Sequence, residues 1–362
     1  MKITLGQFTR KSLAFAVILL THTACIRSTG RPKNVILLIG DGMGVEQVKA
    51  AGMYANGEAG SLSFEDFPYQ AQMTTHSASH QITDSAAGGT AIATGMKVNN
   101  ETISIAIPGD KTELKTLLEY AQERGKSTGL VTTTTITHAT PAAFGAHEIS
   151  RYNEAAIAKD YLTQTRPEVL FGGVAEGMTP TTAKEAGYKV ITDAPQMAAM
   201  DTESVTRVSG QFAEGHLPFE FDGLGSAPHL SEMTATALKI LDNDPDGLFL
   251  MVEGGRIDHA GHQNNIERNV TETVEFAKAV QVAFDWAKGR KDTLIIVLSD
   301  HETGGLNVLE NRGKGEFPQV SWSTPGHTAD PVPVYGWGKN AHYIEGVIDN
   351  TEIFAIVTVT VE

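Results

Sequence analysis

Apolar residues along the chain gather in short uninterrupted runs and do not alternate with polar residues. The first run lies at 34–40, within "NVILLIGDGMG", and similar runs lie at 128–136, 247–255, 293–305 and 332–338. Uninterrupted apolar runs of this length are typical of parallel strands that are buried on both faces. We therefore predict a buried strand in each run.

Helical patterns lie between these runs, for example at 114–122 and 267–288. Strands that alternate with helices indicate an α/β fold, here a three-layer sandwich with a mainly parallel central sheet and helices on both faces. The sequence shows no internal repeat and no second-domain linker, so we expect residues 34–362 to form a single domain. Residues 165–227 are less regular, and we expect a peripheral segment there.

The N-terminus has the pattern of an export signal. Basic residues within 2–11 precede an apolar run at 13–20, and small residues surround Cys25. The run is too short to span a bilayer as a permanent helix. We predict a signal peptide at 1–24, a linker at 25–33 and a periplasmic location.

Cys25 is the only cysteine, so no intramolecular disulfide is possible. Its position just after the apolar run suggests a lipoprotein cleavage site with a lipid anchor on Cys25. His22 departs from the usual residue of such sites. Lipidation and simple secretion therefore both stay open.

Polar residues follow the predicted strands at their carboxyl ends, where open parallel sheets bind ligands. Asp258 and His262 are four residues apart in "EGGRIDHAGH", so one helical turn would place them on the same face. "SDHETGG" and "STPGHTADP" add further carboxylates and imidazoles. The candidate metal ligands are Asp41, Glu253, Asp258, His262, Asp300, His301 and His327.

This set is too large for one tetrahedral zinc ion. Two zinc-like sites and a harder, oxygen-rich site suited to Mg²⁺ would use it, so the residues themselves predict a hydrolase with several metal ions. The formal net charge of −15 argues against a nucleic-acid-binding protein, which needs a basic surface. An anionic substrate would need local cations to overcome this field.

Ser85 in "QITDSAAGGTAIATG" precedes a run of small residues that suits a helix. A serine in this position is commonly the N-cap of the helix. The same position also places a hydroxyl at the positive end of the helix dipole, where an anion binds. The stretch alone does not decide between a cap and a nucleophile.

Taken together, the motifs resemble those of the alkaline phosphatase family. They are "GDGMG", "TDSAAGGTAIATG", "THATPAAFGAHEISR", "EGGRIDHAGH", "SDHETGG" and the "GH" at 326–327, in the family's order. The resemblance runs from about Asn34 to the C-terminus, and several independent blocks make it highly specific.

The resemblance implies a role for each matching residue. Ser85 would be the nucleophile that becomes phosphorylated and a hydroxyl ligand of one zinc ion, and Arg151 would bind phosphate oxygens. The implied ligand sets are Asp258, His262 and His327 for one zinc ion, Asp41, Asp300 and His301 for the second, and Asp41, Thr140 and Glu253 for a magnesium ion.

Two positions that vary within the family carry His138 and His259 here. We expect neither side chain to be a direct ligand. Both would contact magnesium or phosphate indirectly, through water molecules. The resemblance leaves open whether His138 instead recruits a different third ion.

The function implied by the resemblance is hydrolysis of small-molecule phosphate monoesters at alkaline pH through a phosphoserine on Ser85. The implied cofactors are two Zn²⁺ and one Mg²⁺, and family analogy suggests a homodimer. One alternative is a phosphodiesterase or sulfatase on the same metal scaffold. Another is a non-catalytic periplasmic protein that binds metal or phosphate.

Overall fold

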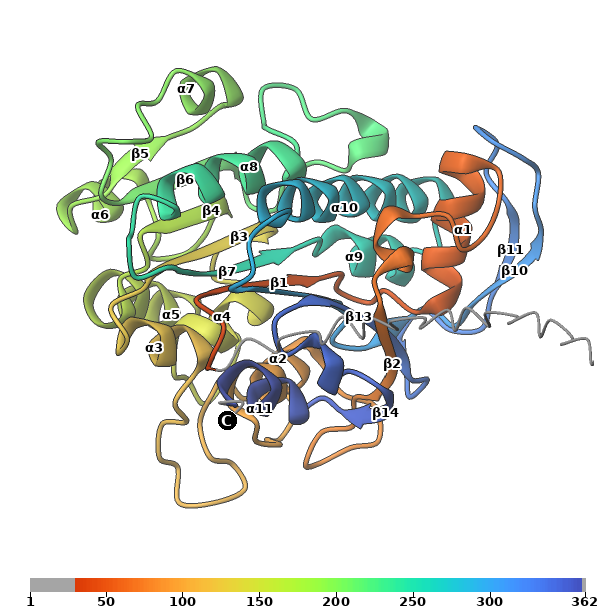
Figure 1. Ribbon diagram of the computed structural model, residues 1–362, viewed down its shortest axis with the longest axis horizontal. Coiled ribbons are helices and arrows are strands. Elements are labelled where there is room, and N and C mark those ends of the chain that lie inside the picture. The colour runs from red at the N-terminus through yellow and green to blue at the C-terminus, as the bar shows by residue number, and fades with distance from the viewer. Residues whose placement is uncertain (1–29, 360–362) are drawn as a thin grey trace, which may run out of the picture.

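A large twisted sheet forms the middle layer of the molecule (Figure 1). The computed structural model describes residues 30–359 and orders the ten strands of this sheet β14-β2-β13-β8-β1-β7-β3-β4-β6-β5. Strand β13 runs antiparallel to both of its neighbours, and the other strand pairs of the sheet are parallel. Two short antiparallel pairs, β10 with β11 and β12 with β9, lie outside it.

The strands are β1 Asn34–Ile39, β2 Tyr69–Thr74, β3 Ser127–Thr135, β4 Val169–Val174, β5 Lys189–Ile191, β6 Val208–Glu214, β7 Leu248–Glu253, β8 Thr293–Leu298, β9 Glu302–Thr303, β10 Leu306–Glu310, β11 Gln319–Trp322, β12 His327–Thr328, β13 Val332–Gly338 and β14 Gly346–Asp349. The α-helices are α1 Val45–Asn56, α2 Ser85–Thr94, α3 Leu117–Gln122, α4 Ala139–Gly145, α5 Glu154–Asp160, α6 Pro180–Glu185, α7 Ala194–Ala198, α8 Leu230–Leu241, α9 Arg256–His262, α10 Ile266–Ala287 and α11 Glu352–Thr358.

Strand β1 shows why the apolar runs do not alternate. Every residue of β1 is buried, because β7 and β8 pair with its two edges and helices cover both faces. Leu37 and Ile39 pack in the core below the sheet, and Ile36 and Leu38 pack in the core above it. A strand in this position has no polar face to present.

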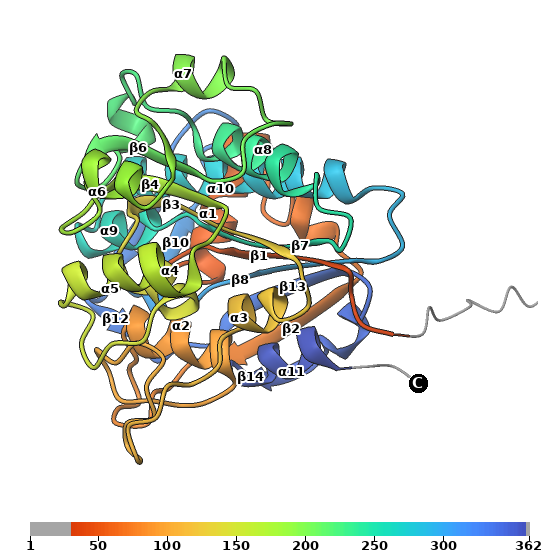
Figure 2. The same cartoon turned by 90° about the vertical axis from the view of Figure 1, so that its left-hand side faces the viewer.

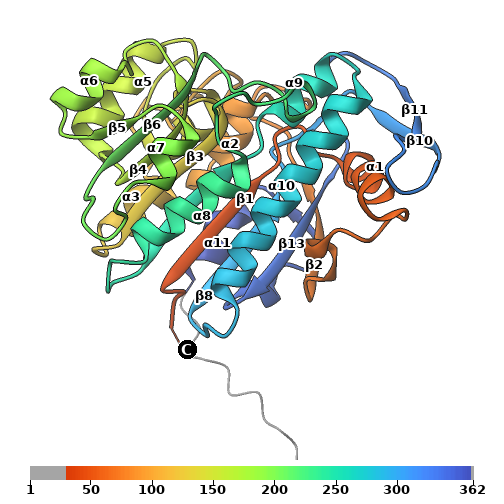
Figure 3. The same cartoon turned by 90° about the horizontal axis from the view of Figure 1, so that it is seen from above.

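Helices cover the sheet on both sides. Figures 1 and 2 show α1, α8 and α10 on one face and α2, α3 and α11 on the other. Figure 3 shows α10 lying across the central strands, with the β10–β11 pair beside α1 at one end. The apolar side chains divide into two large buried clusters, one for each face, as a three-layer sandwich requires.

The predicted fold class is confirmed, and each of the five predicted strands is present. Residues 165–227, which we expected to be a peripheral segment, contain β4, β6 and β5, and these strands form one end of the main sheet. The segment is thus at the edge of the molecule but extends its central layer.

The predicted signal peptide at 1–24 and Cys25 lie outside the described residues, as does most of the linker at 25–33. Within residues 30–359, no helix combines the length and the apolar character that crossing a bilayer requires.

Candidate active site

Three central strands bring together the acidic residues at their carboxyl ends. β1 lies between β7 and β8, and Ile39 is in register with both Glu253 and Leu298. Glu253 ends β7, while Asp41 and Asp300 come shortly after β1 and β8. All three carboxylates are fully buried, so they need positive charge or hydrogen-bond donors nearby.

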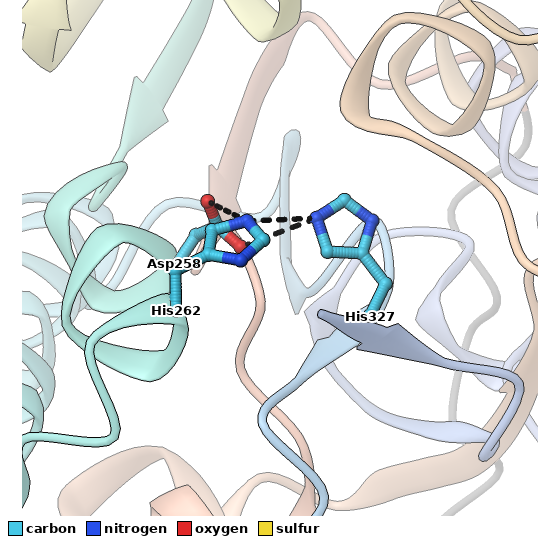
Figure 4. A group of neighbouring side chains, drawn as sticks. All are labelled: Asp258, His262 and His327. Carbon is cyan, nitrogen blue, oxygen red and sulfur yellow. Dashed lines mark hydrogen bonds and ion pairs between the residues drawn. The ribbon is translucent and has the colours of Figure 1, made fainter. Parts of the chain in front are cut away.

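Helix α9 and the short strand β12 supply a second group, shown in Figure 4. Nε2 of His262 lies 3.3 Å from Oδ2 of Asp258, and Nε2 of His327 lies 3.5 Å from Oδ1 of the same carboxylate. Nδ1 of His262 donates to the carbonyl of Pro325 at 2.6 Å, and Nδ1 of His327 donates to that of Thr83 at 2.8 Å.

These two carbonyls fix the tautomers of both rings, because a carbonyl only accepts hydrogen bonds. In the neutral rings both Nε2 atoms then carry lone pairs, and they lie 3.2 Å apart beside Asp258. Without a cation, the hydrogen bond to Asp258 raises the pKa of His262 to about 9. Two imidazole nitrogens and a carboxylate that converge in this way form a donor set suited to zinc.

His301 connects this group to the acidic residues. Its Nε2 lies 3.6 Å from Oδ1 of Asp41, 3.4 Å from Oδ2 of Asp300 and 3.3 Å from Oγ of Ser85. Its ring stacks on that of His327 with centroids 3.6 Å apart. Burial and the neighbouring His327 hold the pKa of His301 well below its ordinary value, so the ring is neutral and available as a ligand.

Glu253 forms a third group with Asp41 and His138, whose potential ligand atoms lie within 4.8 Å of one another. Thr132 and Thr134 donate to Oε2 of Glu253, while Oε1 has no partner. Oγ1 of Thr140 is likewise buried and without a hydrogen-bond partner.

The buried carboxylates near these groups lack the donors that burial demands. Both oxygens of Asp41 and Oδ2 of Asp300 have no hydrogen-bond partner among the described residues. Burial, reinforced by neighbouring carboxylates, raises the pKa of Asp41 well above its ordinary value and that of Asp300 to about 7. Such unsatisfied oxygens fit divalent cations, which would supply the missing positive charge.

Ser85 is the first residue of α2, and the cap of this helix is Asp84. Oδ1 of Asp84 accepts the backbone N–H of Ala87 at 3.0 Å. Ser85 is therefore not the cap, and no backbone group of the helix uses its hydroxyl. It points toward His301 at the positive end of the helix.

Arg151 is held on two sides. Its Nη1 donates to Oδ2 of Asp84 at 3.0 Å, and its Nη2 donates to Nε2 of His138 at 3.2 Å. Although burial lowers it, the pKa of Arg151 is raised by the negative charge of Asp84. The guanidinium is therefore charged and oriented before any ligand arrives.

A cluster of three imidazoles stands behind Arg151. The rings of His138, His216 and His259 lie with centroids 4.6 to 5.6 Å apart. Nδ1 of His216 accepts the N–H of Thr135, and Nδ1 of His259 accepts from Arg256 at 2.7 Å. Burial lowers the pKa of His216 to about 4 and that of His259 to about 3, so both are neutral donors through Nε2.

These groups surround an open cavity of about 430 Å³. It is lined by Asp84, Ser85, Asn100, Glu101, His138, Arg151, Tyr152, Asp258, His259, His262 and His327. The cavity lies beyond the carboxyl ends of the central strands, as expected for an open parallel sheet. Its residues can bind an anion and place a serine oxygen against it.

Comparison with known proteins agrees with this geometry. The sequence model described as alkaline phosphatase matches residues 32–318. The chain belongs to the alkaline phosphatase family. It is a metal-dependent enzyme of the phosphoric monoester hydrolase class, and it carries candidate metal-binding groups at the expected edge of the sheet.

Similar alkaline phosphatases cover nearly the whole chain. Alkaline phosphatase 3 of Bacillus subtilis is 34% identical over 89% of this chain and 87% of its own length. Streptomycin-6-phosphate phosphatase of Streptomyces griseus is 33% identical over 93% of this chain and 92% of its own. The solved alkaline phosphatase of the Antarctic bacterium TAB5 is 32% identical, with a TM-score of 0.79, over 91% of this chain and 98% of that one.

The structure brings every predicted site residue into this region, and it adds residues that the motifs did not single out. Thr303 donates to Oδ1 of Asp258 at 2.5 Å, and its place two residues after His301 on a strand would have indicated a shared face. His216 comes from the segment that we expected to be peripheral. No local pattern in the sequence marks it, because its neighbours come from β3, α4 and α9.

Proposed function

We propose that this alkaline phosphatase hydrolyses phosphate monoesters to alcohol and inorganic phosphate through a covalent phosphoserine on Ser85. The observation that supports it best is the arrangement of Ser85 and Arg151. The unused hydroxyl of Ser85 and the fixed guanidinium of Arg151 line the same cavity, between the carboxylates and imidazoles.

The buried oxygens and paired imidazoles support two Zn²⁺ and one Mg²⁺ as cofactors. We assign Asp258, His262 and His327 to one zinc ion, Asp41, Asp300 and His301 to the second, and Asp41, Thr140 and Glu253 to magnesium. When bound, the ions supply positive charge that stabilises a serine alkoxide, the leaving oxygen and an attacking hydroxide.

His138 fits an indirect role at the third ion. Its Nε2 accepts from Arg151, which can only donate, so Nδ1 of the neutral ring carries the proton. A protonated nitrogen cannot ligate a metal, but it can donate to a carboxylate or to a water molecule. This supports a hard Mg²⁺ ion with water ligands over an ion that needs imidazole.

The residues of the chain then perform an in-line displacement. Arg151 donates to two phosphate oxygens and orients phosphorus toward Oγ of Ser85. Oγ releases its proton to solvent and forms a bond to phosphorus, while the bond from phosphorus to the ester oxygen breaks and that oxygen takes a proton from solvent as the alcohol leaves. A water oxygen then forms a bond to phosphorus and loses a proton to solvent, the bond from phosphorus to Oγ breaks, and Oγ regains a proton as inorganic phosphate departs.

The test is a panel of phosphate monoesters, phosphate diesters and sulfate esters, run together with metal analysis of the purified enzyme. We expect monoesters to be turned over fastest, phosphate to be trapped on Ser85 after acid quenching, and Ser85→Ala to lose at least about a hundredfold in rate. Faster diester or sulfate turnover would favour the sister activities on the same scaffold. Binding without turnover would favour a non-catalytic protein.

The N-terminal pattern supports export to the periplasm, with Cys25 as the first mature residue, and the family supports a homodimer. Mass spectrometry of the mature N-terminus distinguishes a lipidated Cys25 from simple secretion. Sedimentation of the metal-loaded enzyme measures its oligomeric state.

A further inference from the structure

The wall of the cavity next to Arg151 includes Asn100 and Glu101. Nδ2 of Asn100 donates to the carbonyl of Ile82 at 3.2 Å. The carboxylate of Glu101 is exposed, and no cation among residues 30–359 forms an ion pair with it. Both residues line the cavity that holds Ser85.

The backbone of Glu101 fixes this wall to the phosphate-binding groups. Its N–H donates to Oδ2 of Asp84 at 3.1 Å, and its carbonyl accepts the N–H of Arg151 at 2.7 Å. Glu101 adopts a left-handed φ of 72°, a conformation that is uncommon for a residue other than glycine. The backbone of Glu101 is therefore held in place relative to Arg151.

Tyr152 completes the wall with an aromatic ring. It follows Arg151 directly, lines the same cavity and is 72% exposed. None of the described residues forms a hydrogen bond with its hydroxyl, and no described arginine or lysine lies over its ring. An aromatic face of this kind attracts a cation through its quadrupole.

Two chemically different sides thus share one cavity. The side formed by Arg151 and the metal-ligating residues suits the phosphate group. The carboxylate of Glu101 and the aromatic ring of Tyr152 form the other, and neither group favours a second anion. Because the phosphate group fills only part of a cavity of about 430 Å³, the alcohol of the substrate reaches this second side.

We propose, on the basis of the phosphomonoesterase function above, that Glu101 and Tyr152 select monoesters whose alcohol carries a cationic amine. The carboxylate of Glu101 attracts the charge, and the ring of Tyr152 contacts it. Amino alcohol phosphates are the substrate class that fits this wall. Esters whose alcohol carries a second phosphate are the class that it disfavours.

The test compares phosphocholine with 3,3-dimethylbutyl phosphate, in which a carbon atom replaces the quaternary nitrogen and removes the charge. The measured quantity is the ratio of their kcat/KM values in the metal-loaded enzyme. We expect the wild-type ratio to lie between about 3 and about 10, mainly because KM is lower for phosphocholine. An exposed ion pair and a cation–π contact each strengthen binding by up to about fivefold. Added salt should reduce the ratio.

Glu101→Gln should lower this ratio by about threefold, and Tyr152→Leu by a similar factor. Glu101→Asp, which keeps the charge, should preserve most of it. Glu58→Gln is the matched control, because Glu58 is an exposed carboxylate in the turn after α1 and does not line the cavity. We expect this control to leave the ratio unchanged.

A wild-type ratio near one, or a ratio that Glu101→Gln does not change, would overturn the proposed selectivity while leaving the phosphatase function intact. Failure of the wild-type enzyme to hydrolyse either ester would contradict the proposed function instead. In that case the ratio of the dissociation constants of the two esters would still test whether Glu101 and Tyr152 favour a cationic alcohol.

Discussion

The carboxylate of Asp84 joins the guanidinium of Arg151 to the start of helix α2 at Ser85. Oδ2 accepts Nη1 of Arg151 at 3.0 Å, and Oδ1 caps α2 through the N–H of Ala87 at 3.0 Å. Ser85, the next residue, is therefore fixed relative to the guanidinium by a single side chain. Phosphate would meet both groups already oriented, so little entropy is lost on binding.

Asp84→Asn should separate these two tasks. Asparagine caps a helix about as well as aspartate, so the melting temperature should change little. The charge-assisted bond to Arg151 is lost, and inhibition by inorganic phosphate should weaken about tenfold or more. Asp84→Ala should also lose about 1 kcal/mol of stability. Asp193→Asn alters the cap of α7 outside the site and should change neither property.

Removal of metal should destabilise the enzyme most at alkaline pH. In the metal-free protein the pKa of Asp300 is raised to about 7, so its contribution to stability is fully present below about pH 4 and is lost as pH rises through about 7. The pKa of Asp41 is raised as well, by burial and by neighbouring carboxylates, so its contribution is also lost as pH rises. Bound cations offset the cost of burying the ionised carboxylates, and they bind only to the ionised form. At alkaline pH and a metal concentration a thousandfold above Kd, the free energy of unfolding should therefore be about 4 kcal/mol higher without chelator than with it. Near pH 5 this difference should be smaller. Equal differences at both pH values would contradict the assignment.

Thr303→Val should weaken zinc binding. Thr303 donates to Oδ1 of Asp258 and orients this carboxylate toward His262 and His327. Loss of such a supporting bond typically lowers metal affinity by about 10-fold to 100-fold. Thr271→Val removes a hydroxyl that bonds only to the backbone of α10 and serves as control. Zinc competition with a chromogenic chelator measures both variants, and equal affinities would refute this role.

Glu272→Gln should flatten the pH dependence of stability. Burial raises the pKa of Glu272 to about 8, so the contribution of this carboxyl is present below about pH 4.5 and is lost as pH rises through 8. Glutamine keeps the acceptor for the N–H of Glu220 and does not ionise. As the pH rises from 5 to 9, the free energy of unfolding of the variant relative to that of the wild type should increase by on the order of 3 kcal/mol. Parallel stability curves would argue against the raised pKa.

The central part of the fold follows from the sequence because burial on both faces leaves an unmistakable pattern. β1, β7 and β8 are uninterrupted apolar runs, and each was predicted. β4 and β6 are buried over their first five residues, but β4 contains Gly172 and Gly173, and polar Ser209 and Gln211 interrupt β6. These residues interrupt the apolar pattern, so the sequence does not predict the two strands. Their position in the sheet depends on the strands with which they pair.

The candidate site follows from the sequence where ligands stand in compact motifs, such as Asp258 with His262. The role of Asp84 was not predicted, because only the structure shows the guanidinium of Arg151 beside it. His216 is similar, since it reaches His259 from a distant loop. Residues that act through contacts between separate elements carry no periodicity of their own.

His327 stands on β12, which pairs only with β9, yet its partners Asp258 and His262 come from α9. The site therefore draws on segments from Asp41 to His327, spread over nearly the whole described chain. During biosynthesis, no partial chain that lacks β12 holds the complete ligand set. If these residues hold the metal ions as proposed, activity appears only after the last long-range contacts form. The return of activity in a refolding experiment would then report completion of the native topology, which helix content does not.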